Sequence, residues 1–135
     1  MKKIDVVAAV IINDNQVLCV QRAFSKYEYI SNKYEFPGGK VEANESEKDA
    51  LKREVQEELS LNIKVGAKFI TVNHDYPDFS ISLHTYLCEC KNRDIILHEH
   101  IDFKWLDIKN LKKLDWAQAD YPIIDKLLDC ERQLN

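Results

Sequence analysis

The chain has 135 residues, of which 45% are hydrophobic and 31% are charged, and its formal net charge is −4 at pH 7. This composition is that of an ordinary globular protein, and the length suits one domain, over residues 1–135, with a sizeable core. The negative charge argues against non-specific binding to DNA, RNA or an anionic membrane, because such surfaces repel an acidic protein. A negatively charged substrate would therefore need local cations or a bound metal.

The segments before residue 60 alternate between strand and turn signals and end in a helix. Residues 6–12 are a β-branched and alanine run, typical of a strand covered on both faces. Their order is a strand over 6–12, a turn over 13–15, a strand over 16–22, a loop over 23–33, a short strand over 34–36, a tight turn over 37–39 and a helix over 46–59. We expect the glycines of the tight turn to supply positive φ angles and a close backbone approach.

The second half repeats this arrangement of strands followed by a helix. Its order is a strand over 62–73, a turn over 75–78, an alternating strand over 79–90, a loop over 91–94, a strand over 101–106, a helical turn over 107–114 and an amphipathic helix from residue 119 or 120 to 134. This helix would bury Ile123, Ile124, Leu127, Leu128 and Cys130. The pattern predicts an α+β fold with a mixed sheet between helices.

No targeting or membrane segment is evident in the sequence. The run after Met1 is too short for a signal peptide, and none approaches the roughly 20 apolar residues of a membrane span. Cys19 and Cys130 lie in patterns typical of buried thiols. We expect a reduced, cytoplasmic protein, either a monomer or a homodimer.

Three glutamates crowd one face of the helix over residues 46–59. Glu54, Glu57 and Glu58 stand at i, i+3 and i+4, where like charges destabilise a helix by roughly 0.2–0.5 kcal/mol per pair. They also lie near its C-terminus, where the helix dipole disfavours negative charge. A divalent cation such as Mg²⁺ or Mn²⁺ would explain the cluster, because hard cations prefer oxygen ligands. A solvated acidic face is the alternative.

The spacing of charged residues around this helix resembles the Nudix box, the signature of Nudix hydrolases. From Gly39 the chain continues through Glu45 to the segment REVQEELSL, residues 53–61. Ser60 stands where the family usually has glycine, at the left-handed residue that ends the helix. The similarity extends to MutT-like and CTP-pyrophosphohydrolase-like members through the segments EFPGGK, DYPD, HEH and WAQAD. It implies an α/β/α sandwich in which the box helix packs against a mixed sheet.

The resemblance implies roles for the residues of the box. Glu54, Glu57 and Glu58 match metal ligands, and the backbone carbonyl of Gly38 matches another ligand. Arg53 matches a residue that orients the carboxylates. Glu45 matches the residue that holds the loop against the helix, and Gly39 belongs to the same structural part of the box.

Further candidates lie outside the box. Glu99 matches a carboxylate that binds metal or acts as a general base in this subgroup, and Arg22 and Lys40 match basic positions near the phosphates. Asp120 stands at the start of the last helix, where it could be only an N-cap. An ionised carboxylate there would accept a hydrogen bond from an exocyclic amino group, as on cytosine or adenine. Aromatic residues could stack on a base; the candidates are Tyr34, Tyr76 and Phe79, although each also suits a sheet or a core.

Cysteine and histidine pairs allow a competing metal site. Cys88 and Cys90 precede His98 and His100, and a zinc ion across a hairpin could bind all four. Cysteines in zinc sites more often have two to four residues between them, whereas Cys88 and Cys90 have one, and alternating hairpin residues explain the pattern without metal.

The expected function is Mg²⁺-dependent hydrolysis of a nucleoside triphosphate to the monophosphate and pyrophosphate, as the resemblance implies. The expected substrate is a small nucleotide, either canonical or carrying a modified or oxidised base, with a preference for cytosine. The enzyme would thereby sanitise the nucleotide pool, and no nucleic acid polymer or membrane partner is expected. Two alternatives remain open. The chain could hydrolyse another nucleoside diphosphate derivative, such as a nucleotide sugar or dinucleotide, or it could be a nucleotide sensor without turnover.

Overall fold

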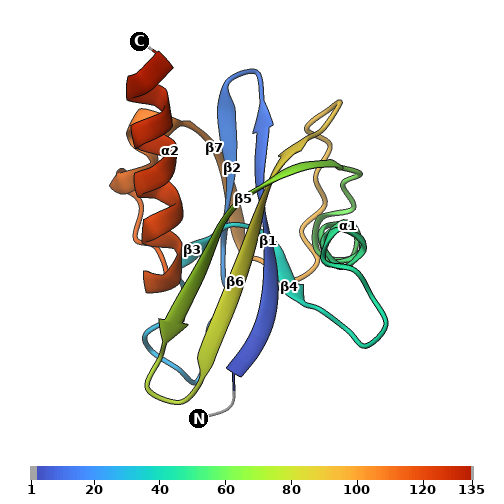
Figure 1. Cartoon of the computed structure of the whole chain (residues 1–135), viewed down its shortest axis with the longest axis vertical. Helices are drawn as coiled ribbons and strands as arrows, with labels where there is room; N and C mark the ends of the chain where they lie inside the picture. Colours follow the sequence, from blue (N-terminus) through green and yellow to red (C-terminus); the bar gives the residue numbers. More distant parts are fainter. Residues whose placement is uncertain (1–2, 135) are drawn as a thin grey trace.

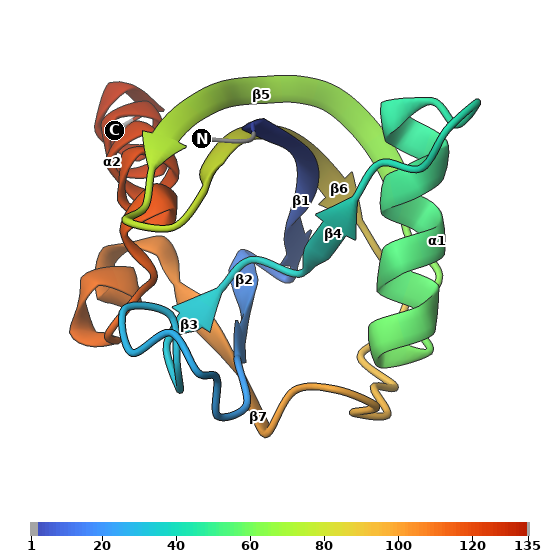
Figure 2. The same cartoon turned by 90° about the horizontal axis from the view of Figure 1, so that it is seen from below.

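A mixed seven-stranded sheet lies between two helices in the computed structural model, which describes residues 3–134 (Figure 1). The expected domain extends to residues 1, 2 and 135, which lie outside this range. No helix in residues 3–134 combines the length and apolar character needed to cross a bilayer. The sandwich architecture predicted from the sequence is therefore confirmed, with the two helices on opposite faces of the sheet (Figure 2).

The centre of the sheet is β1 (Lys3–Asn13), which runs parallel to β6 (Ser80–Glu89) along most of its length. β6 pairs antiparallel with the edge strand β5 (Lys64–Asp75). The remaining strands are β2 (Gln16–Gln21), β3 (Tyr34–Glu35), β4 (Gly38–Lys40) and β7 (Asp102–Asp107). The strands predicted over 62–73, 79–90 and 101–106 are thus present with their ends shifted by one or two residues.

Strands β1 and β2 diverge after their hairpin, and the chain between β3 and β4 crosses the gap. The hairpin end of β1 pairs with β2, whereas its other half pairs with β4 through Val6, Val7 and Ala8. Figure 2 shows β3 beside β2 and β4 beside β1, joined by the crossing segment. This crossing brings Glu35, Gly38 and Gly39 to the same opening in the sheet.

The tight turn predicted over residues 37–39 is wrong, because Gly38–Lys40 form β4 and no glycine in the described chain has a positive φ. Glycine is needed at position 38 for a close approach instead. A Cβ atom there would lie 1.9 Å from the carbonyl oxygen of Val7 on the neighbouring strand. The sequence signal was therefore genuine, but it marks strand packing rather than a turn.

Helix α1 (Glu47–Leu59) has the ends that its sequence predicts. The hydroxyl of Ser46 accepts a hydrogen bond from the Asp49 amide at 3.1 Å, which caps the first turn. Ser60 ends the helix in the left-handed conformation, with φ 52° and ψ 35°. Helix α2 (Tyr121–Leu134) follows two 3-10 helices, Ile108–Lys113 and Gln118–Asp120.

Alternate residues of β1 face the two helices, so that both sides of the sheet are covered. Val7, Ala9 and Ile11 pack with the apolar face of α1, and Ala8 and Val10 pack on the α2 side. The buried residues of the helices are Ala50, Leu51, Val55 and Leu59 in α1, and Ile123, Ile124 and Leu127 in α2. Leu128 packs at the edge of the α2-side core. Cys19 is buried as expected, but Cys130, in the last turns of α2, is only half-buried.

Candidate active site

A cleft opens where β1 and β2 diverge, and it consists of two connected cavities. The α2-side cavity, about 550 Å³, lies between the sheet and the start of α2, and the α1-side cavity, about 530 Å³, extends to the C-terminal half of α1. Six residues line both cavities: Arg22, Ser25, Glu35, Gly38, Gly39 and Lys40. Arg22 and Lys40, predicted to contact phosphates, therefore stand at the junction of the two cavities.

Arg53 organises the carboxylates at the α1-side cavity. Its Nε and Nη2 atoms donate to the two carboxylate oxygens of Glu45 at 2.7 and 2.9 Å. Its Nη1 atom donates to Glu54 at 2.8 Å and to Glu57 at 3.3 Å. The two hydrogen bonds from Arg53 to Glu45 lower the pKa of Glu45 to about 2. One guanidinium group thus ties the loop before α1 to the helix and holds two of the clustered carboxylates.

Glu58 is the buried member of the cluster. Its side chain is 4% exposed, and its Oε1 atom has no hydrogen-bond partner within the described chain. Burial, followed by the negative charges of Glu35, Glu54 and Glu99, raises its pKa to about 9. Such a carboxylate is costly unless a cation or proton neutralises it.

The backbone of β4 lies directly against the carboxylate cluster. A Cβ atom on Gly39 would be 2.3 Å from Oε2 of Glu54, so a side chain at this position would displace that carboxylate. Glycine at positions 38 and 39 therefore keeps space for the backbone between β1 and α1. This is the close approach that the sequence analysis expected from the PGG segment.

The donor chemistry of this site fits a hard divalent cation. Glu54, Glu58 and Glu99 line the α1-side cavity with carboxylate oxygens, and the Gly38 carbonyl belongs to the adjacent strand. Glu57, whose side chain is 57% exposed, lies on the same helix outside the lining of both cavities. Arg53 occupies Glu54 and Glu57, and no three Asp, Glu, His or Cys side chains of residues 3–134 are arranged to coordinate an ion as they stand. The unpartnered oxygen of Glu58 is the specific feature that a cation would satisfy.

The alternative zinc site is not assembled in the part of the chain that the structure describes. Cys88 is buried in the α1-side core. His98 shares a hydrogen bond with Ser60 at 2.7 Å, and His100 shares one with Glu35 at 2.9 Å. These residues therefore make separate contacts and do not converge on one point, because each histidine faces a different partner.

The α2-side cavity has an aromatic wall and a buried acid. Phe79 and Tyr76 line it, and the Tyr76 hydroxyl accepts a hydrogen bond from the Ala119 amide at 3.0 Å. Asp120 is 5% exposed, and burial, together with the charge of Glu35, raises its pKa well above its ordinary value. Burial and the charge of Glu35 therefore favour the acid form of Asp120 over the ionised form expected from the sequence, and a carboxylic acid both donates and accepts hydrogen bonds.

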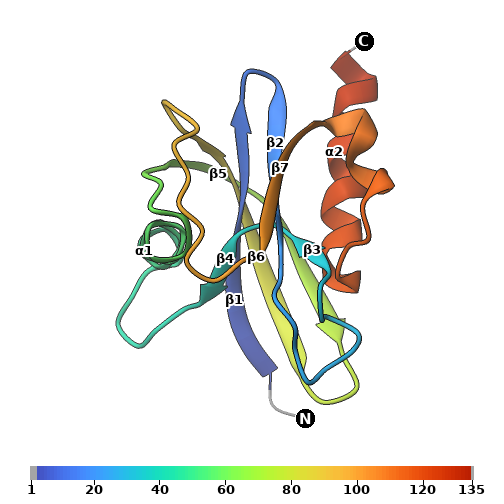
Figure 3. The same cartoon turned by 180° about the vertical axis from the view of Figure 1, so that it is seen from behind.

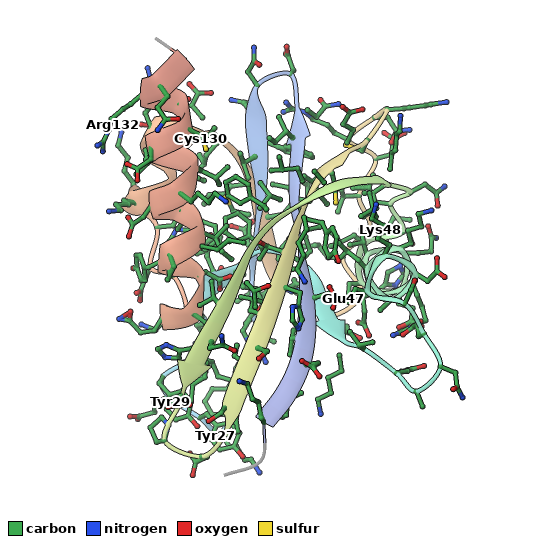
Figure 4. The ribbon with its side chains drawn as sticks, viewed as in Figure 1. Tyr27, Tyr29, Glu47, Lys48, Cys130 and Arg132 are labelled. Atoms are coloured by element: carbon green, nitrogen blue, oxygen red, sulfur yellow. The ribbon has the colours of Figure 1, made fainter. Side chains whose placement is uncertain are left out.

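A loop over residues 22–33 closes one side of the α2-side cavity. Tyr29 stacks on Tyr76 with ring centroids 5.3 Å apart, and its hydroxyl donates to Asp78 at 2.7 Å. Tyr27 packs against Phe79 at 5.8 Å. Figure 4 shows Tyr27 and Tyr29 beside the turn between β5 and β6. The sequence analysis treated this segment only as a loop, although its tyrosines were the signal for an aromatic contact.

Glu35 lines both cavities although the sequence analysis did not name it, and His100 lies in the cleft although the sequence analysis considered it only as a zinc ligand. Glu35 accepts a hydrogen bond from Nη1 of Arg22 at 3.0 Å, besides its contact with His100. Its neighbours Tyr34 and Phe36 are buried, so an isolated acid between two apolar strand residues was the available signal. Tyr34 itself packs against Trp116 outside both cavities, which excludes it as a residue that stacks on a ligand there.

Comparisons with known proteins agree with this geometry. The NUDIX domain family matches residues 2–127. The 8-oxo-dGTP diphosphatase of Escherichia coli K12 is 31% identical, covering 94% of this chain and 98% of that protein. The CTP pyrophosphohydrolase of the same strain is 32% identical, covering 95% and 93%. The solution structure of MutT from methicillin-resistant Staphylococcus aureus 252 is 45% identical, with a TM-score of 0.73 and coverage of 96% and 98%. The chain therefore belongs to the NUDIX domain family, as a Nudix pyrophosphohydrolase.

Proposed function

We propose that this protein hydrolyses a nucleoside triphosphate to the monophosphate and pyrophosphate, with Mg²⁺ or Mn²⁺ bound at the α1-side cavity. The observation that carries the proposal is the buried carboxylate of Glu58, whose unpartnered oxygen lies in a cleft that continues into an aromatic cavity. A nucleotide suits these two cavities, because its charged phosphates need the polar, carboxylate-lined cavity with its cation and its flat base needs the aromatic one. The names of the relatives, which include a diphosphatase of 8-oxo-dGTP and a pyrophosphohydrolase of CTP, support a role in sanitising the nucleotide pool.

Glu54, Glu57, Glu58 and Glu99 would hold the cation together with the Gly38 carbonyl. When bound, the cation supplies charge neutralisation for the phosphates and lowers the pKa of a water molecule. Arg53 positions Glu54 and Glu57 through the hydrogen bonds described above. Arg22 and Lys40 bind phosphate oxygens at the junction of the cavities, where a water molecule attacks phosphorus in line with the leaving group.

Asp120 would read the base at the far end of the α2-side cavity. Its acid form presents one donor and one acceptor, which pair with the ring N3 acceptor and the amino group of cytosine. Tyr76 and Phe79 supply apolar walls on which the base packs. This arrangement suits cytosine and also adenine, whose N1 atom and amino group form the same pair, since a protonated acid recognises two groups of such an edge whereas a carboxylate recognises one.

A product-resolved screen tests the proposal. Canonical and modified ribo- and deoxyribonucleoside triphosphates, nucleotide sugars and dinucleotides are incubated with the protein and Mg²⁺, and products are identified by mass. We expect monophosphate and pyrophosphate, fastest from cytosine nucleotides, and Glu57→Gln should reduce the rate by orders of magnitude. Release from nucleoside diphosphate derivatives alone would favour the other hydrolase, and nucleotide binding without any product would favour a sensor.

A further inference from the structure

The loop between β6 and β7 carries Glu99 and lies across the end of α1. Its amides at Ile96 and His98 donate to the carbonyl oxygens of Leu59 and Glu58, both at 3.0 Å. These carbonyls belong to the last turn of α1, where intrahelical partners are missing. Figure 3 shows this segment passing beside α1 on its way to β7. The backbone on one side of Glu99 is thus attached to the helix that bears the other carboxylates.

The two histidines that flank Glu99 make hydrogen bonds in different places, one outside the cleft and one inside it. The His98 ring shares a hydrogen bond of 2.7 Å with the hydroxyl of Ser60, outside the cleft. The His100 ring is buried, and its Nε2 atom lies 2.9 Å from Oε2 of Glu35 and 3.7 Å from Oε2 of Glu58. Glu99 itself is exposed and lines the α1-side cavity.

Ser60 is an unusual residue for its backbone conformation. Its φ of 52° places it in the left-handed region, where a residue other than glycine is conformationally strained. Its hydroxyl, however, gives His98 a partner that glycine would not provide. The hydrogen bond between Ser60 and His98 thus comes with backbone strain at Ser60, and this strain points to a role for the hydrogen bond.

We propose that His98 and His100 are positioning residues that clamp Glu99 over the carboxylate cluster, and that Ser60 is the anchor of His98. The inference rests on the proposed function, because Glu99 must act at the metal and phosphate site for its placement to affect the rate. A side chain on a loop is otherwise free to move, and a displacement of about 1 Å at a reacting centre can reduce a rate about 100-fold. Attachment on both sides removes most of that freedom without requiring either histidine to contact the substrate.

Ser60→Gly separates positioning from ordinary structural support, because the two effects have opposite signs. Glycine relieves the left-handed strain, so the melting temperature should stay equal or rise. The loss of the His98 partner should nevertheless lower kcat, by about fivefold or more, with little change in KM. Asn15→Gly is the matched control, since Asn15 also has a positive φ, of 60°, but lies in the β1–β2 turn away from the cleft.

The roles of the histidines are tested with alanine, which removes the hydrogen-bonding group, and with glutamine, which keeps one. His98→Ala should lower kcat as Ser60→Gly does, and the double variant should lose no more than either single variant. His100→Ala should lower kcat further, and His100→Gln, which retains an N–H group, should recover part of the loss. His84→Ala is the control, because His84 on β6 is also a hydrogen-bonded histidine, paired with Asp5, but it lines neither cavity.

Hydrogen exchange in a chelator gives a readout that does not depend on activity. In His98→Ala the amides of residues 96–101 should exchange about five- to tenfold faster, as expected from the loss of one hydrogen bond. Unchanged exchange, or faster exchange with unchanged kcat, would overturn the clamp while leaving the proposed hydrolysis intact. If the unaltered protein released no product from any nucleotide, the proposed function would fail, and the role of the clamp in catalysis with it.

Discussion

Arg53 donates hydrogen bonds to both carboxylate oxygens of Glu45, with N–O distances of 2.7 and 2.9 Å, and its third nitrogen donates to Glu54 at 2.8 Å. A planar guanidinium can make these contacts at once because its donors point in fixed directions. The loop before α1 and the carboxylates on α1 therefore depend on a single side chain for their relative placement.

Arg53→Lys should lower kcat about 100-fold, because an ammonium group cannot reproduce the paired contact and leaves Glu54 and Glu57 poorly oriented. Lys52→Ala, at an exposed position on the same helix, should have little effect. Steady-state kinetics with a cytosine nucleotide measures both variants. Equal kcat values for Arg53→Lys and the unaltered protein would show that the orientation of these carboxylates is unimportant.

Glu58→Gln should stabilise the metal-free protein at alkaline pH. The folded-state pKa of Glu58 is raised from 4.5 to about 9, so between these values the unfolded chain is ionised while the folded chain still holds the proton. Stability therefore falls as pH rises through this window, by at most about 1.4 kcal/mol per pH unit from this group. Thermal melts in chelator between pH 5 and 9 should show a shallower decline for Glu58→Gln than for the unaltered protein.

Glu57→Gln is the control for that experiment, because the Glu57 side chain is 57% exposed. Its melting curve should follow the pH dependence of the unaltered protein. Both variants should lose activity, so Glu58→Gln would gain stability at the expense of turnover. A parallel decline for all three proteins would show that Glu58 is not held in its acid form.

Asp120→Asn should retain recognition of the base, whereas Asp120→Ala should raise KM about tenfold or more, because the amide keeps one donor and one acceptor and alanine keeps neither. The pKa of Asp120 is raised by burial, so its O–H donor persists to higher pH than that of an exposed aspartic acid and is lost as pH rises through the raised pKa. KM for a cytosine nucleotide should therefore increase with pH in the unaltered protein more than in Asp120→Asn. Identical pH profiles would contradict the acid form.

The two adjacent glycines should respond differently to alanine. A Cβ atom on Gly38 would meet the Val7 carbonyl oxygen at 1.9 Å, and backbone cannot yield, so Gly38→Ala should lower the free energy of unfolding by about 3 kcal/mol. A Cβ atom on Gly39 would meet the end of the Glu54 side chain, which can rotate. Gly39→Ala should therefore fold but lose kcat and need more Mg²⁺ for half-maximal activity.

Gly66→Ala serves as the control for both variants. Its Cβ atom would lie 2.9 Å from the Leu87 carbonyl oxygen, between β5 and β6 and away from the carboxylates. It should lower stability without changing the Mg²⁺ requirement. Denaturant unfolding and Mg²⁺ titrations of activity separate the two effects, and equal Mg²⁺ requirements for Gly39→Ala and Gly66→Ala would rule out displacement of Glu54.

Local patterns were sufficient to predict most elements of the fold. The helix predicted over residues 46–59 and the two-sided burial predicted for residues 6–12 both depend on interactions within one segment or on a simple period. The PGG segment shows where such reasoning fails, since the same glycines that suggest a turn also permit close strand packing. Which of these occurs at Gly38 depends on Val7, a residue that local sequence does not reveal as its neighbour.

The sequence by itself determined the carboxylate cluster, because the spacing of Glu54, Glu57 and Glu58 on one helix sets their common face. Only the tertiary structure decided which of them is buried, and it also decided that the pKa of Asp120 is raised. Both outcomes depend on desolvation and on charges brought from other strands, above all from Glu35. The pairing of Ser60 with His98 likewise arises only when the loop before β7 packs across the end of α1.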